Sequence, residues 1–129
     1  MSGVLVVDDD AAVAEAVRFV LTRAGYTVKT ASTIAEGRAH TAEGGFSVAV
    51  IDVWMDHEDG LELATDLSQA GLPFIVMSGG GPGRTLESMT ARADALGAVR
   101  VLFKPFDDDE LLSAIDAALA SGGSEYARV

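Results

Sequence analysis

Acidic, hydroxyl and basic side chains follow four short apolar runs of this sequence. In chain order they are Asp8 and Asp9 after residues 4–7, Asp52 after residues 48–51, Ser78 after residues 74–77, and Lys104 after residues 101–103. If the runs are parallel strands, their carboxyl ends lie at one edge of a sheet, where open α/β proteins bind ligands. The sequence therefore predicts that these side chains converge in one cleft.

Together these residue types could support phosphoryl transfer. Carboxylates that share a cleft repel one another, which raises their pKa values unless a cation intervenes. Mg²⁺ is a suitable cation because it takes carboxylate, water and phosphate oxygens as ligands. With Mg²⁺ and Lys104 to balance a phosphoryl group, Asp52 can attack phosphorus and form an acyl phosphate. The Ser78 hydroxyl and the backbone N–H groups of Gly79 and Trp54 are candidates to hold the phosphoryl oxygens.

The elements that position these side chains alternate between strand and helix. The four apolar runs are continuous, as in parallel strands buried on both faces, whereas residues 27–31 alternate, as an edge strand does. Helical patterns separate the strands and cover residues 13–24, 33–43, 61–70, 85–96 and 111–119. This order predicts an α/β fold with one parallel sheet, right-handed crossovers and helices on both faces.

Length, composition and charge narrow the classes of protein to consider. The 129 residues fit one domain, predicted at residues 1–120, and residues 121–129 are predicted to be a flexible C-terminal tail or the start of a linker. The absence of cysteine excludes disulfides and thiolate metal sites. No apolar run approaches the roughly 20 residues of a membrane span, and no signal peptide is recognisable. A net charge of −11 repels nucleic acid. We expect a cytoplasmic protein without direct nucleic-acid or membrane contacts.

The chain resembles the receiver domains of response regulators, including chemotaxis regulators, over residues 4–120. The matching motifs are Val6-Val7-Asp8-Asp9, Asp52 with Met55 and Asp59-Gly60-Leu61-Glu62-Leu63, Met77-Ser78-Gly79, and Phe103-Lys104-Pro105-Phe106. The resemblance implies a flavodoxin-like, doubly wound fold with five helices and a five-stranded parallel sheet in the order 2-1-3-4-5. It also implies a phosphorylation switch of a two-component or phosphorelay system.

The resemblance assigns a role to each candidate residue. Asp52 is the phosphoacceptor, Ser78 hydrogen-bonds the phosphoryl group and Lys104 pairs with it. The implied ligands of Mg²⁺ are Asp9 directly, Asp8 mainly through water, Asp52, and the backbone carbonyl of Trp54. The peptide bond from Lys104 to Pro105 is expected to be cis.

The implied partners are a phosphoryl donor and a protein that reads the result. The donor is expected to be a histidine kinase or a histidine phosphotransfer protein, and the reader a downstream protein target. We expect a stand-alone receiver and a switch rather than an enzyme, with limited self-catalysed phosphorylation and dephosphorylation. Two alternatives stay open. An aspartyl phosphatase would need a second aspartate where Trp54 lies, and an unphosphorylated interaction module would make no use of Asp52 and Lys104.

Four positions depart from the family pattern. Val101 replaces an aromatic, Asp56 replaces a proline, Trp54 is large, and residues 79–83 lengthen the segment between Ser78 and Lys104. Val101 is too short to act as the family's aromatic lever. We therefore predict that phosphorylation orders residues 79–83, which include four glycines, and shifts the helix that begins near Thr85.

Several of these features also have simpler interpretations. Asp10 is expected to cap the first helix, and the acids at positions 107–110 to cap the last one rather than bind a second metal. The glycine-rich segment lacks the lysine of a P-loop. His40 and His57 are expected to be solvated. Trp54 is either a partly buried anchor or an exposed contact residue.

Overall fold

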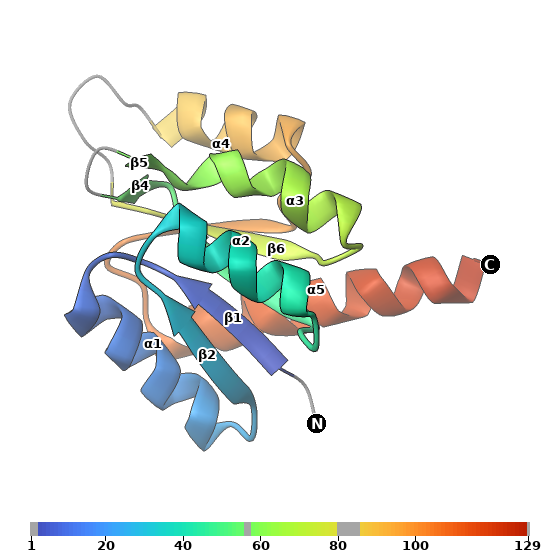
Figure 1. Ribbon diagram of the computed structural model, residues 1–129, viewed down its shortest axis with the longest axis horizontal. Helices are drawn as coiled ribbons and strands as arrows, with labels where there is room; N and C mark the ends of the chain where they lie inside the picture. Colours follow the sequence, from blue (N-terminus) through green and yellow to red (C-terminus); the bar gives the residue numbers. More distant parts are fainter. Residues whose placement is uncertain (1–2, 56–57, 80–85, 129) are drawn as a thin grey trace.

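Five parallel strands form the central sheet of the computed structural model, which describes residues 3–55, 58–79 and 86–128. The strands are β1 (Gly3–Val7), β2 (Thr27–Ala31), β3 (Val48–Asp52), β6 (Phe74–Ser78) and β7 (Arg100–Phe103). Their order is β2-β1-β3-β6-β7 (Figure 1). This is the predicted order 2-1-3-4-5, because β6 and β7 are the fourth and fifth strands of the sheet. The prediction of the fold is confirmed.

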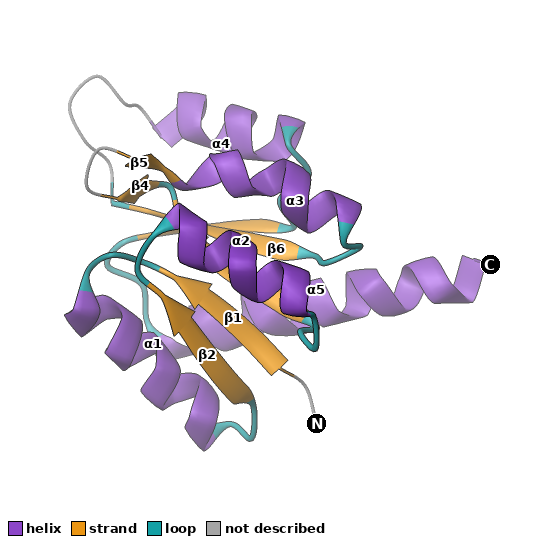
Figure 2. Ribbon diagram, viewed as in Figure 1, coloured by secondary structure: helices purple, strands orange, loops and turns teal. Residues whose placement is uncertain are grey.

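In the part of the chain that the structure describes, four α-helices connect these strands and a fifth follows β7, and together they cover both faces of the sheet (Figure 2). They are α1 (Ala11–Arg23), α2 (Ile34–Glu43), α3 (Ala64–Gln69), α4 (Leu86–Ala95) and α5 (Asp108–Arg128). None of the helices in the described ranges combines the length and the hydropathy that crossing a bilayer requires.

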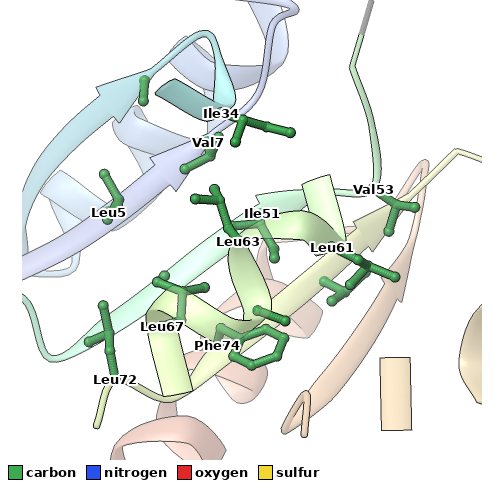
Figure 3. Packing of buried hydrophobic residues seen from close by; sticks show 14 of the residues in the cluster. Leu5, Val7, Ile34, Ile51, Val53, Leu61, Leu63, Leu67, Leu72 and Phe74 are labelled. Carbon is green, nitrogen blue, oxygen red and sulfur yellow. The ribbon is translucent and has the colours of Figure 1, made fainter. Parts of the chain in front are cut away.

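Alternate residues of each central strand enter one of two hydrophobic cores. Leu5, Ile51 and Phe74 belong to the core that α2, α3 and Ala93 of α4 cover (Figure 3). The residues one position away, such as Val4, Val50 and Ile75, belong to the core under α1 and α5. Strands with two buried faces must be apolar throughout, which explains the continuous apolar runs of the sequence.

Side-chain caps fix the beginnings of α1 and α5. Asp10 accepts hydrogen bonds from the backbone N–H groups of Ala12 and Val13 at 3.0 and 3.3 Å, as predicted. Before α5, Glu110 N–H donates to the Asp107 carboxylate at 2.8 Å and Asp107 N–H donates to the Glu110 carboxylate at 3.1 Å. This reciprocal capping box confirms that these two acids stabilise a helix start.

The prediction of a third helix over residues 61–70 is wrong for residues 61–63, which are not α-helical. The chain after β3 forms a short hairpin of β4 (Trp54–Met55) and β5 (Glu58–Asp59), then a 3₁₀ turn η1 (Gly60–Leu63), and only then α3. Asp59 accepts a hydrogen bond from Leu61 N–H at 2.9 Å, and this cap begins a tight turn rather than an α-helix. A four-residue turn of this kind leaves no periodicity in the sequence.

The C-terminal end also differs from the predicted secondary structure. Residues 121–128, predicted to be a flexible tail, continue α5 as helix and project beyond the sheet (Figure 1). Residues that extend an existing helix avoid the cost of nucleating a new one. The domain boundary at residue 120 stays a prediction.

Candidate functional site

The predicted site residues lie at the carboxyl ends of three adjacent strands and one edge strand. Asp8 and Asp9 follow β1, Asp52 and Ser78 are the last residues of β3 and β6, and Lys104 follows β7. Lys104 N–H donates to the Ser78 carbonyl at 2.8 Å, so the pairing of β6 with β7 continues up to the site. The parallel topology therefore brings together residues that are up to 96 positions apart.

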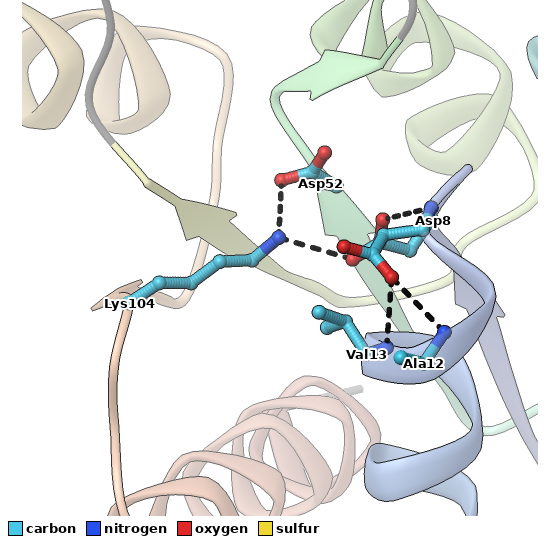
Figure 4. Close-up of polar contacts among 6 residues, drawn as sticks. Asp8, Ala12, Val13, Asp52 and Lys104 are labelled. Atoms are coloured by element: carbon cyan, nitrogen blue, oxygen red, sulfur yellow. Dashed lines mark hydrogen bonds and ion pairs between the residues drawn. The ribbon is translucent and has the colours of Figure 1, made fainter.

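Lys104 is held between two aspartates. Its Nζ lies 3.1 Å from Oδ2 of Asp8 and 3.1 Å from Oδ1 of Asp52 (Figure 4). The peptide bond between Lys104 and Pro105 is cis, as the resemblance implied. The two ion pairs make Lys104 a fixed ammonium group within the cleft and not a solvated surface lysine.

Burial sets the electrostatics of the carboxylates. Asp52 is 4% exposed, and burial together with the charge of Asp8 raises its pKa to about 6, against the opposing effect of Lys104. Burial alone would lower the pKa of Lys104, but the charges of Asp52 and Asp8 outweigh burial and raise it. One ammonium group thus compensates the two buried carboxylates only in part, and the cleft favours an additional cation.

Three carboxylates are close enough to share such a cation. Asp8, Asp9 and Asp52 each offer one oxygen, and these oxygens lie within 4.8 Å of one another. Both oxygens of Asp8 already accept hydrogen bonds, Oδ1 from Asp10 N–H at 2.9 Å and Oδ2 from Lys104, whereas Asp9 is exposed. An all-oxygen, acidic donor set of this kind fits a hard divalent ion such as Mg²⁺.

The remaining predicted site residues border this cluster. Ser78 is 4% exposed and its carbonyl accepts the hydrogen bond from Lys104 N–H, and a Cβ placed on Gly79 would lie 3.7 Å from Cδ of Lys104, so both residues adjoin the lysine. The Trp54 side chain is 45% exposed, which favours an exposed contact residue over a buried anchor. The role of its carbonyl as a metal ligand stays a prediction. Asp56, His57 and residues 80–83 of the glycine-rich segment lie outside the described residues.

Known proteins share both the sequence pattern and the fold. The family model of the response regulator receiver domain matches residues 4–116. The chain belongs to this family. The receiver domain is 35% identical over 119 residues to the transcriptional regulatory protein FixJ of Bradyrhizobium diazoefficiens, with 90% of this chain and 56% of FixJ covered. It is 38% identical over 120 residues to the DNA-binding transcriptional regulator NtrC of Rhizobium meliloti, with 91% of this chain and 24% of NtrC covered.

A solved receiver structure has the same architecture. The CheY-like receiver domain protein of Methanospirillum hungatei superimposes with a TM-score of 0.85 at 28% identity, with 97% of this chain and 98% of that chain covered. The receiver domain described here spans about half the length of FixJ and about a quarter of NtrC. It thus corresponds to one domain of those regulators.

Gly60, Asp59 and Arg92 support the site of this receiver domain through contacts that the sequence does not reveal. Gly60 N–H donates to the Val53 carbonyl at 2.7 Å, and a Cβ on Gly60 would overlap the carbonyl oxygen of Asp52. Asp59 caps η1 and forms an ion pair with Arg92 of α4. The Asp59-Gly60 pair was visible as part of a motif, but nothing in the sequence connects it with Arg92.

Proposed function

We propose that this receiver domain accepts a phosphoryl group on Asp52 and carries it as an acyl phosphate. The observation that supports this most directly is the buried Asp52 carboxylate in contact with Lys104, beside Asp8 and Asp9. The donor is a phosphorylated histidine of a histidine kinase or phosphotransfer protein. In the transfer, an Asp52 oxygen forms a bond to phosphorus while the phosphorus–nitrogen bond of the donor breaks, and the imidazole leaves with that electron pair.

Each residue of the site has its own role in this transfer. Asp52 attacks in its ionised form, which predominates above its pKa of about 6. Lys104 lies 3.1 Å from the attacking carboxylate and offsets the negative charge that gathers on the phosphoryl oxygens. Ser78 donates its hydroxyl hydrogen to one of those oxygens. Mg²⁺, held by Asp9, Asp52, the Trp54 carbonyl and, through water, Asp8, would neutralise charge on the phosphoryl group when bound.

In this role the domain is a switch and not an enzyme that turns over a substrate. Its output is read by a downstream protein target. The domain itself makes no direct contact with nucleic acid, because its net charge is −11. The relatives named as transcriptional or DNA-binding regulators are longer than the matched region. We also propose that this receiver acts alone and in the cytoplasm. A phosphatase is less favoured, because Trp54 occupies the position of its second aspartate.

Phosphorylation with a small donor tests this function. We expect the chain incubated with acetyl phosphate and Mg²⁺ to gain the mass of a single phosphoryl group, measured on the intact protein. The same incubation with EDTA in place of Mg²⁺ is the control and is expected to leave the mass unchanged. A chain whose mass does not change with Mg²⁺ present would refute the proposed function.

The affinity for Mg²⁺ is expected to fall further in Asp9→Asn than in Asp8→Asn. Asp9 is exposed and lies within reach of the shared site, whereas both Asp8 oxygens already accept hydrogen bonds. We expect Asp9→Asn to weaken Mg²⁺ binding at least about tenfold and Asp8→Asn to weaken it less. Trp54 is the one tryptophan of the sequence and follows the site, so its fluorescence reports a Mg²⁺ titration. Equal losses in the two variants would contradict this assignment of ligands.

A further inference from the structure

An ion pair joins α4 to the loop that follows the phosphoacceptor. Nη2 of Arg92, on α4, contacts Oδ2 of Asp59, the last residue of β5. The two residues are 33 positions apart, and the Asp59 side chain is 20% exposed. This contact gives α4 a polar link to the hairpin beside it (Figure 1).

On the hairpin side, Asp59 is tightly connected to the backbone of Asp52. Asp59 pairs with Trp54 across the two-stranded β4–β5 ladder, and its Oδ1 accepts the hydrogen bond from Leu61 N–H. The next residue, Gly60, is bonded to the Val53 carbonyl and packs against the Asp52 carbonyl without room for a Cβ. A shift of the backbone at positions 52–54 must therefore move Asp59.

On the other side, α4 buries little of the side chains that the structure describes. Among the side chains of α4 that the structure describes, Ala93 is the one that is buried. Leu96, directly after the helix, is 38% exposed. Arg92 and Asp59 are both partly exposed, and an ion pair of this kind can bias the position of a helix by a small factor in an equilibrium constant.

We propose that the Asp59–Arg92 ion pair is a latch that holds α4 against the β4–β5 hairpin, and that phosphorylation of Asp52 loosens it. This inference rests on the proposed function. A phosphoryl group on Asp52 has to be accommodated beside Val53 and Trp54, which shifts the hairpin and withdraws Asp59 from Arg92. Val101, half-buried in the core, has no aromatic ring to carry the signal along β7, whereas the latch leads directly from the phosphoacceptor loop to α4.

Thermodynamic linkage connects two measurable effects of the latch, one of phosphorylation on α4 and one of the ion pair on phosphorylation. If the latch belongs to the unphosphorylated state, its removal must favour the phosphorylated conformation by the same factor by which phosphorylation loosens it. An exposed ion pair supplies up to about a fivefold change in an equilibrium constant, and we expect about threefold here. Arg92 is thus a positioning residue and takes no part in the transfer itself.

Hydrogen exchange in the unphosphorylated full chain tests the structural half of the proposal. Arg92→Gln is expected to speed amide exchange over residues 86–96 about threefold. Arg38→Gln is the matched control, because Arg38 also forms an exposed ion pair, with Asp66 at 3.0 Å, but between α2 and α3. It is expected to leave residues 86–96 unchanged. Equal exchange over these residues in the two variants would overturn the latch.

Binding of the phosphoryl mimic beryllofluoride, with Mg²⁺ and Trp54 fluorescence as the readout, tests the coupling. Arg92→Gln and Asp59→Asn are each expected to bind it about threefold more tightly than the unsubstituted chain, and the double variant no more tightly than either, because both remove one contact. Asparagine retains the cap on η1, so Asp59→Asn isolates the ion pair. The mimic is also expected to speed exchange over residues 86–96 in the unsubstituted chain.

The possible failures are distinguishable. If the chain binds beryllofluoride or takes up phosphate but Arg92→Gln binds the mimic as Arg38→Gln does, the latch is refuted and the proposed function stands. If the mimic binds without any change in exchange over residues 86–96, the latch is likewise refuted. If the chain neither binds the mimic nor becomes phosphorylated, the proposed function fails and the latch fails with it.

Discussion

Asp52→Asn is expected to reduce phosphoryl uptake from acetyl phosphate to the background of the assay. The amide oxygen of asparagine is a far weaker nucleophile than a carboxylate and cannot form a stable acyl phosphate at this position. Asparagine has almost the same shape as aspartate, so the buried environment at the end of β3 is preserved. Loss of uptake would therefore reflect loss of the nucleophile and not of the fold.

A second carboxylate controls for the change in net charge. Asp94→Asn removes a carboxylate at an exposed position of α4 and is expected to take up phosphate as the unsubstituted chain does. Stoichiometric labelling of Asp52→Asn would show that another residue accepts the phosphoryl group. Circular dichroism of the two variants would establish that both are folded.

The same substitution is expected to stabilise the metal-free protein by about 3 kcal/mol near pH 8. Burial and the charge of Asp8 raise the pKa of Asp52 from 3.8 to about 6 in the folded chain. A folded-state pKa above the unfolded value means that the protonated carboxyl favours folding. This contribution is fully present below about pH 4 and is lost as the pH rises through about 6. Asparagine stays neutral at every pH and avoids the loss.

Urea unfolding in EDTA at several pH values measures this effect. The free energy of unfolding of Asp52→Asn minus that of the unsubstituted chain is expected to be near zero at about pH 4 and to grow to about 3 kcal/mol at about pH 8. Asp94→Asn, again, controls for the loss of one charge. A difference that stays constant over this range, or an Asp52→Asn chain that is the less stable one at pH 8, would contradict the raised pKa.

Most of the site could be predicted because its residues mark the ends of strongly apolar strands. Residues 4–7, 48–51 and 74–77 are buried on both faces of the sheet, so their composition alone indicates central parallel strands. Parallel topology then places Asp8, Asp52 and Ser78 at one edge. The position of Lys104 between the two aspartates follows from the same topology, since β7 ends beside β6.

Features that rest on short elements or distant pairs could not be predicted. The β4 and β5 strands have two residues each, too few for any periodicity, and η1 continues into α3 without a break in the sequence pattern. The Asp59–Arg92 ion pair joins residues 33 positions apart, and a single sequence offers many alternative partners for each charge. Residues 121–128 form helix, although their glycines and serines are typical of a flexible tail.

Locating the phosphoryl group on the unsubstituted chain tests the central claim most directly. The chain is phosphorylated with acetyl phosphate and Mg²⁺ and then treated with borohydride, which reduces an acyl phosphate on aspartate to the alcohol of homoserine. Tandem mass spectrometry of the digested protein then identifies the reduced position. We predict that Asp52 alone is converted. Conversion of Asp8 or Asp9, or a phosphate found instead on Ser78, would contradict the assignment of Asp52 as the phosphoacceptor.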